Sequence, residues 1–283
     1  MVYAKRMTLS VRNNFLKGGI VLAVLSLSLI SAGGYFSFPA YQEAVESAAL
    51  RSRGIIQMLI ESLVKPSAYV PFWTMLGASA YSLLSVVLIY YLFEKTQSPE
   101  ILFFGFFAMS LSFESARIII PLKAIFPYTA MYLVTASRLL LFGRYFGLFS
   151  LFAASSFAAG LDVQKQQNVF LMLVFAALII TLNVPVDSLV WDSSLKFLSG
   201  YRIMFNMVEA GILLVTIITF FISAYTRGSR NYIFIGIGTF LALAGRNIML
   251  ASDTWITPIP GLLILAAGTW FVCTRLHRIY LWL

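Results

Sequence analysis

The chain has 283 residues, of which 60% are hydrophobic and 11% are charged, and its formal net charge is +9. Soluble domains carry about 25% charged residues, so this composition excludes an ordinary soluble protein and indicates one that lies in a membrane. Its single cysteine and single histidine exclude a disulfide framework, a bis-histidine haem and the two-histidine zinc protease motif. The basic residues flank apolar stretches, where lipid headgroups and topology explain them, so we do not expect nucleic acid as a partner.

The first 17 residues are basic and contain no acidic side chain, and an apolar run follows from Gly18 to Phe38. We interpret this run as an uncleaved signal anchor, preceded by a cytoplasmic basic N-terminus over residues 1–17. Residues 40–65 differ from the apolar runs, because charged side chains are spread through them while apolar side chains recur at intervals of three to four residues. This spacing predicts an extracytoplasmic amphipathic helix, which either fills the connection at the membrane surface or docks on the bundle as a lid.

Seven further apolar stretches are long enough to cross a bilayer as helices: 71–93, 101–122, 127–157, 168–185, 202–225, 232–250 and 259–276. A helix satisfies every backbone group within one segment, and the alternating pattern of a membrane barrel is absent. All nine prolines lie at the ends of these stretches or in loops, which predicts continuous helix interiors. We therefore expect an all-α polytopic membrane helical bundle of about eight transmembrane helices, forming one integral membrane domain over residues 1–283.

Lysine and arginine are unevenly divided between the two sides of this predicted bundle. With the N-terminus inside, the inner segments carry ten of them and the outer segments carry six. This bias predicts a plasma (inner) membrane protein with both termini in the cytoplasm. Trp73, Trp191 and Trp255 would then anchor the outer interface, where aromatic side chains gather.

Of the ionisable residues inside the predicted spans, five are expected to form a site: Glu114, Arg117, Arg138, Glu209 and Arg246. A charge in hydrocarbon costs several kcal/mol unless it is paired or hydrated, so such residues usually face a bundle interior and mark a functional site. With about 1.5 Å of rise per residue, all five lie near the middle or in the outer half of the membrane. We expect them to line one polar cavity that opens to the extracytoplasmic side.

The pairing of these charges leaves one arginine over. Arg117 follows Glu114 by three residues and is close enough on a helix to pair with it, while Glu209 is expected to pair with Arg138 or Arg246. The remaining guanidinium matches a carboxylate or a phosphate, so the ligand is expected to be an anionic small molecule or lipid headgroup. Neutral hydrogen-bonding groups for the same site are expected from Asn206 and Asn247.

Two neighbouring features are assigned to packing. Arg144 lies nearer the inner interface, where a long side chain can snorkel, and is expected to be structural. Gly143 and Gly147 form a GxxxG pattern, which predicts close helix packing inside the molecule.

No catalytic or metal-binding residues are predicted, and no cofactor, because the chain lacks a Walker loop, a GxSxG motif and metal-ligand clusters. We therefore expect a non-catalytic receptor or sensor-like module that binds its anionic ligand in the outer half of the membrane and relays to a partner protein. Membrane lipids are the other expected partners, and whether the protein forms a homo-oligomer is an open alternative. The alternatives are a secondary transporter of an organic anion, a membrane scaffold or assembly subunit whose charges serve packing only, and, least favoured, a lipid-modifying enzyme.

Overall fold

The computed structural model describes residues 9–49, 67, 69–96, 98–123, 125–126, 129–191, 194–195, 197–199 and 202–281. The described chain forms a helical bundle whose elements run α1 (Leu9–Ala49), α3 (Val70–Phe93), α4 (Pro99–Ser110), the 3-10 helix η1 (Leu111–Ile118), α5 (Ile119–Leu122), α6 (Ala130–Ala158), the 3-10 helix η2 (Val163–Lys165), α7 (Gln166–Asn183), β1 (Val186–Trp191), β2 (Phe197–Ser199), α8 (Arg202–Thr226), α9 (Asn231–Leu250) and α10 (Pro258–Leu281). Among the described residues, eight helical segments are long and apolar enough to cross a membrane. The predicted polytopic helical bundle is confirmed.

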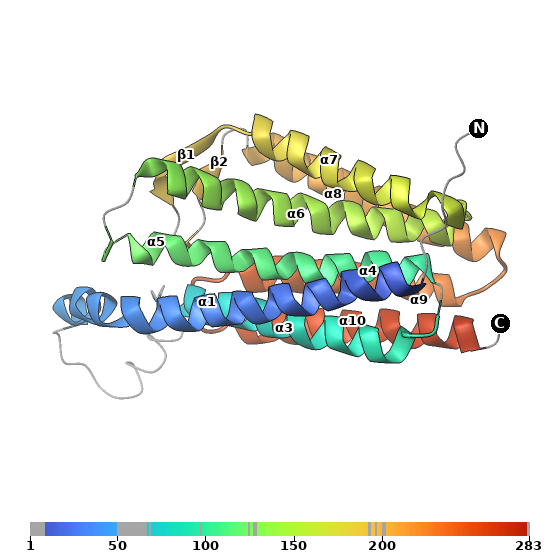
Figure 1. Cartoon of the computed structure of the whole chain (residues 1–283), viewed down its shortest axis with the longest axis horizontal. Helices are drawn as coiled ribbons and strands as arrows, with labels where there is room; N and C mark the ends of the chain where they lie inside the picture. The colour runs from blue at the N-terminus through green and yellow to red at the C-terminus, as the bar shows by residue number, and fades with distance from the viewer. Residues whose placement is uncertain are drawn as a thin grey trace.

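The long helices lie roughly parallel to one axis, and the start of α1 and the end of α10 lie at the same end of the bundle (Figure 1). The strands β1 and β2 lie at the opposite end, which we call the hairpin end. They pair antiparallel, with Val186 opposite Ser199 and Trp191 opposite Phe197. This short hairpin occupies the connection between the predicted spans 168–185 and 202–225.

Helix α1 extends further than the predicted first span. It begins at Leu9 and continues through Pro39 to Ala49, so the first ten residues of the predicted amphipathic segment 40–65 continue the same helix. Residues 50–65 of that segment lie outside the described residues, and its docking on the bundle stays a prediction.

Local signals in the sequence explain several helix boundaries at the end opposite the hairpin. Ser98 caps α4, because its hydroxyl accepts a hydrogen bond from the backbone N–H of Ile101 at 3.3 Å, and Pro99 occupies the first helical position. Gly160 and Gly228 adopt positive φ angles of 111° and 61° directly after α6 and α8. Glycine tolerates this left-handed conformation, so both helices end there and the chain reverses.

Helices α9 and α10 approach each other closely along four glycines. A Cβ atom added to Gly245 would lie 2.3 Å from the backbone nitrogen of Leu265, and one added to Gly268 would lie 2.6 Å from the carbonyl oxygen of Gly238. A Cβ on Gly261 would lie 2.6 Å from a backbone nitrogen of α9. Small residues let membrane helices pack backbone to backbone, and this contact places Arg246, the neighbour of Gly245, inside the bundle.

The third span does not keep α-helical geometry throughout. Between α4 and α5 it tightens into η1, the 3-10 helix of eight residues from Leu111 to Ile118. The carbonyl oxygen of Ser112 accepts hydrogen bonds from the hydroxyls of Ser115 and Ser26, both at 2.8 Å. Such hydroxyls compete with the backbone N–H groups that would continue an α-helix. The prediction of uninterrupted helix interiors therefore missed a change of helix geometry at the position of Glu114 and Arg117.

Candidate functional site: a buried arginine and glutamate network on the 3-10 segment

Glu114 and Arg117 form the centre of the network, as an ion pair three residues apart on η1. Their exposed fractions are 5% and 1%, so both charges are removed from water and lipid. In a 3-10 helix, residues three apart lie directly above one another, which brings the carboxylate and the guanidinium together. The predicted pairing of these two residues is confirmed.

Arg117 also joins η1 to the hairpin end of the bundle. Its Nη1 donates hydrogen bonds to the carbonyl oxygen of Leu250 at 3.2 Å and to that of Ser194 at 3.3 Å. Leu250 is the last residue of α9, and the final carbonyls of a helix lack partners within the helix and carry partial negative charge. Arg117 therefore satisfies the end of α9 while it pairs with Glu114.

Arg246 on α9 is 2% exposed, yet its polar contacts are long. Its Nη2 lies 4.0 Å from Oε1 of Glu114, and its Nη1 lies 3.5 Å from the carbonyl oxygen of Arg144. Its guanidinium lies 6.0 Å from the ring centre of Phe107, and its Nε has no hydrogen-bond partner. Within the part of the chain that is described, this buried cation is incompletely satisfied.

The GxxxG pattern on α6 makes room for these groups. A Cβ on Gly143 would lie 2.6 Å from Cβ of Phe113, and one on Gly147 would lie 2.3 Å from the hydroxyl of Ser110 and 3.5 Å from Nη1 of Arg246. The pattern therefore packs α6 against α4, η1 and Arg246, which confirms the predicted intramolecular use.

The fourth and fifth charged groups of the network are Arg144 on α6 and Glu209 on α8. Two nitrogens of Arg144 contact the two carboxylate oxygens of Glu209, at 2.6 and 2.7 Å, and the exposed side-chain fractions are 39% and 14%. This bidentate geometry is the strongest form of a guanidinium and carboxylate pair. The expected partners of Glu209 were Arg138 and Arg246, and both expectations are wrong, as is the interpretation of Arg144 as a snorkelling residue.

Helix rotation, and not depth, explains this error. Helices α6 and α8 are level at the end opposite the hairpin, where Nη2 of Arg227 donates to the carbonyl oxygen of Phe157 at 3.0 Å. From the ends of their helices at that level, Arg144 lies about 21 Å, Glu209 about 26 Å and Arg138 about 30 Å along the axis. Glu209 is thus equally near both arginines in depth. Arg144 follows Arg138 by six positions, which sets the two side chains about 120° apart around the helix axis, so only one arginine faces α8.

The remaining expected site residues do not join the network. Arg138, Asn206 and Asn247 are all exposed on the outside of the bundle. The structure therefore brings together Glu114, Arg117, Arg246 and Glu209 of the predicted set, and adds Arg144. Because Arg144 replaces Arg138, the balance of three guanidinium groups against two carboxylates remains.

Sequence reasoning also missed polar groups at the other end of the bundle. Glu100 is 3% exposed and accepts hydrogen bonds from the hydroxyls of Tyr280 at 2.6 Å and Ser98 at 2.9 Å. Arg12 is 5% exposed and donates to the carbonyl oxygens of Phe93 and Glu94, at 2.8 and 2.7 Å. Basic residues at span ends are expected to face lipid headgroups, and no sequence pattern distinguishes a flanking charge that turns inward.

A buried serine cluster connects η1 to α1 and α3. The hydroxyls of Ser26 and Ser79 lie 2.7 Å apart, and the hydroxyl of Ser112 donates to that of Ser82 at 2.8 Å. Serine is common in apolar spans and its hydroxyl usually bonds its own helix, so the sequence carries little signal for these contacts between helices. The cluster attaches the charged 3-10 segment to two further spans.

The chemistry of the network favours anions over cations. Guanidinium groups bind carboxylates and phosphates, and their surplus positive charge repels metal ions. Among the described residues, no group of three or more His, Cys, Asp or Glu side chains lies close enough to hold a metal ion. Comparisons with known protein families, with curated proteins and with solved structures found no match to this chain.

Proposed function

We propose that this protein is a non-catalytic receptor or sensor-like module of the plasma membrane, with both termini in the cytoplasm, that binds an anionic small molecule or lipid headgroup at Arg246 and Arg144. The observation that supports this most directly is the state of Arg246. It is 2% exposed, its nearest carboxylate oxygen among the described ion pairs is 4.0 Å away, and its Nε has no hydrogen-bond partner. A buried cation in this state gains free energy from an anion that completes its hydrogen bonds.

Arg144 supplies the route to Arg246. Its guanidinium is partly exposed on the flank of α6 while its carbonyl oxygen lies 3.5 Å from Nη1 of Arg246. An anion that first meets Arg144 at this surface exchanges with the carboxylate of Glu209 and then reaches the buried guanidinium. Two arginines with fork geometry favour a carboxylate or phosphate over a spherical ion such as chloride.

The 3-10 segment η1 is the element that would report binding. Glu114 is shared between Arg117 and Arg246, so an anion at Arg246 weakens one of its two attractions. Arg117 connects the same segment to the end of α9, and a 3-10 stretch within a long helix is a common hinge. A shift of η1 would reach the cytoplasmic end through α4, whose first turn holds Glu100 against Tyr280. A partner protein at that end would receive the signal.

A secondary transporter of an organic anion is the second candidate, and η1 is the observation that favours it. Transporters often place irregular helix geometry near the middle of the membrane, beside the substrate site. In that case the ion pair of Arg144 and Glu209 would open and close during transport. A membrane scaffold or assembly subunit would use the same network for packing alone.

Thermal unfolding of the purified full chain in detergent micelles tests the proposal. The probes are phosphatidylglycerol against phosphatidylcholine, and inorganic phosphate and succinate against chloride. A ligand at 100 times its Kd stabilises by about 2.7 kcal/mol, so at least one anionic probe should raise the Tm by several degrees. Arg246→Met should abolish this rise. The matched control is Arg138→Gln, which removes an exposed arginine of the same region and should keep the rise.

Uptake of labelled succinate and phosphate into proteoliposomes distinguishes the candidates. A receptor shows the Tm shift without uptake, whereas a transporter shows uptake that Arg144→Gln removes. An equal response to chloride and to every anionic probe, or an equal loss in Arg138→Gln and Arg246→Met, contradicts anion recognition at this network and leaves the scaffold.

A further inference from the structure

A second candidate site lies apart from the charges, in a groove between α1 and α3 near the hairpin end. Its volume is about 670 Å³, within the size range of small-molecule sites. Nine side chains or backbone positions line it: Ile30, Ser31, Gly34, Tyr35 and Phe36 from α1, and Tyr69, Phe72, Trp73 and Leu76 from the start of α3. None of them is charged, and five are aromatic.

Two adjacent glycines explain why α1 and α3 separate here. A Cβ on Gly33 would lie 2.4 Å from Cγ1 of Ile118, so α1 leans closely on the end of η1 at this level. On the neighbouring side of α1, Gly34 has only Phe72 near its missing Cβ, at 3.9 Å. The first glycine draws α1 toward η1, and the second leaves the space toward α3 unfilled.

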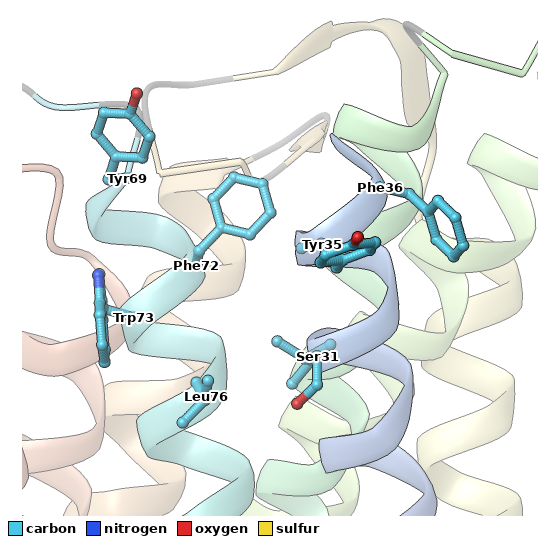
Figure 2. Close-up of a pocket in the computed structure, with 9 residues that line it drawn as sticks. Ser31, Tyr35, Phe36, Tyr69, Phe72, Trp73 and Leu76 are labelled. Carbon is cyan, nitrogen blue, oxygen red and sulfur yellow. The ribbon is translucent and has the colours of Figure 1, made fainter. Parts of the chain in front are cut away.

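The groove is closed at depth and open at the flank. At depth the groove is lined by Ile30, which is 2% exposed and belongs to an apolar cluster with Met75 and Ile118. Phe72 reaches from α3 toward α1, where Tyr35 lies, and Ser31 and Leu76 lie further along the two helices (Figure 2). Tyr35 is 79% exposed and Trp73 58% exposed, so the opening faces the surroundings of the bundle.

The position of the groove along the helices decides what surrounds it. Leu76 lies six residues from the start of its span at Val70, about 9 Å along the axis, and Ser31 lies six residues from the end of its span at Ser37, also about 9 Å. This places the groove within one leaflet, between the headgroups and the bilayer centre. Tyr69, at the start of α3, lies at headgroup level, where amphipathic aromatic rings are favoured.

We propose that this groove holds one acyl chain of a glycerophospholipid from the leaflet at the hairpin end. The lining offers apolar and aromatic surface and no charge for a headgroup, which matches a hydrocarbon chain. The tyrosine hydroxyls at the rim match the ester and phosphate oxygens that follow such a chain toward the interface. The lipid is bound at a shaped site, in contrast to the lipids that only cover the outer faces of α7 and α8.

Photolabelling of the reconstituted full chain tests the assignment. The probe is phosphatidylcholine with a diazirine at the end of one acyl chain, diluted in unlabelled phosphatidylcholine vesicles, and the labelled residues are mapped by mass spectrometry. Label should concentrate between Ile30 and Phe36 and between Tyr69 and Leu76, and should saturate as the probe fraction rises. Label on the exposed residues of α7 and α8 should rise in proportion to the probe fraction.

Matched glycine variants sharpen the test. Gly34→Leu fills the groove and should lower its labelling at least about fivefold, because the leucine side chain displaces more than one buried methylene group of the acyl chain. Gly18→Leu changes a glycine of the same helix with no atom within 4 Å of its missing Cβ, and should leave the labelling unchanged. Ser31→Phe fills the groove from an exposed position and serves if Gly34→Leu does not fold.

The result also separates this site from the anion site. Replacing phosphatidylcholine by phosphatidylglycerol should not change groove labelling, because no charged side chain lines the groove, and Arg246→Met should not change it either. Label that spreads evenly over all lipid-facing helices, or equal labelling of the Gly34→Leu and Gly18→Leu proteins, overturns the proposal.

Discussion

Two single substitutions in the buried network should have opposite effects on stability, although they remove the two partners of one ion pair. In the native protein three guanidinium groups face two carboxylates, and Glu114 serves both Arg117 and Arg246. Glu114→Gln leaves both arginines buried, at 1% and 2% exposure, with no carboxylate beside them. Removing one partner of a buried pair costs about 3–5 kcal/mol, because the other charge loses its compensation.

Arg246→Met should behave differently. Glu114 keeps Arg117 and Glu209 keeps Arg144, so two carboxylates then face two guanidinium groups. Methionine is unbranched like the aliphatic part of arginine and would lie near the ring of Phe107, where thioether contacts with aromatic rings are favourable. Replacing buried charges by apolar side chains is often neutral or stabilising by about 1–4 kcal/mol where no remaining charge loses its partner. We expect an unchanged or raised free energy of unfolding.

The assay is unfolding of the purified protein in mixed micelles, with the mole fraction of a denaturing detergent as the variable and far-UV circular dichroism as the signal. The predicted difference between the two variants is about 3–9 kcal/mol, well beyond the error of such measurements. The change in the free energy of unfolding of the double variant should differ from the sum of the two single changes, because the two residues interact. It should approach the effect of Arg246→Met together with the loss of the ion pair between Glu114 and Arg117. Comparable destabilisation by both single substitutions would refute the idea that Arg246 is the surplus charge.

Three further predictions concern packing and hydrogen bonds, measured in the same unfolding assay. Gly245→Leu should separate α9 from α10 and lower the free energy of unfolding by more than about 3 kcal/mol, since its Cβ would lie 2.3 Å from a backbone nitrogen. The control Gly211→Leu has no atom within 4 Å of its missing Cβ and should be within about 0.5 kcal/mol of the native protein. Tyr280→Phe removes a donor from buried Glu100 and should cost about 1–3 kcal/mol, while Tyr91→Phe, at an exposed position, should cost almost nothing; equal effects would contradict the burial of Glu100. Ser26→Ala breaks two contacts to η1 and α3 and should cost about 0.6 kcal/mol per bond, and Ser28→Ala, whose hydroxyl bonds only its own helix, should be neutral.

The positions of the membrane spans could be predicted from the sequence because the bilayer imposes a local requirement. Each spanning segment must satisfy its own backbone groups and be apolar over about 20 residues, so its limits depend only on residues near to it in the chain. The predicted span 71–93 and the observed Val70–Phe93 differ by one residue. The ion pair of Glu114 and Arg117 is local in the same way, since its partners are three positions apart on one helix.

The composition of the site needed the tertiary structure. Arg144 and Arg138 are almost equally distant from Glu209 in depth, and only the rotation of α6 about its axis, set by Gly143 against η1 and Gly147 against α4, selects Arg144. For the same reason the sequence did not predict that Asn206 and Asn247 are exposed or that Glu100 is buried. Hydrophobic length determines which residues cross the membrane, whereas the azimuth of each helix depends on side chains from other helices that the local sequence does not contain.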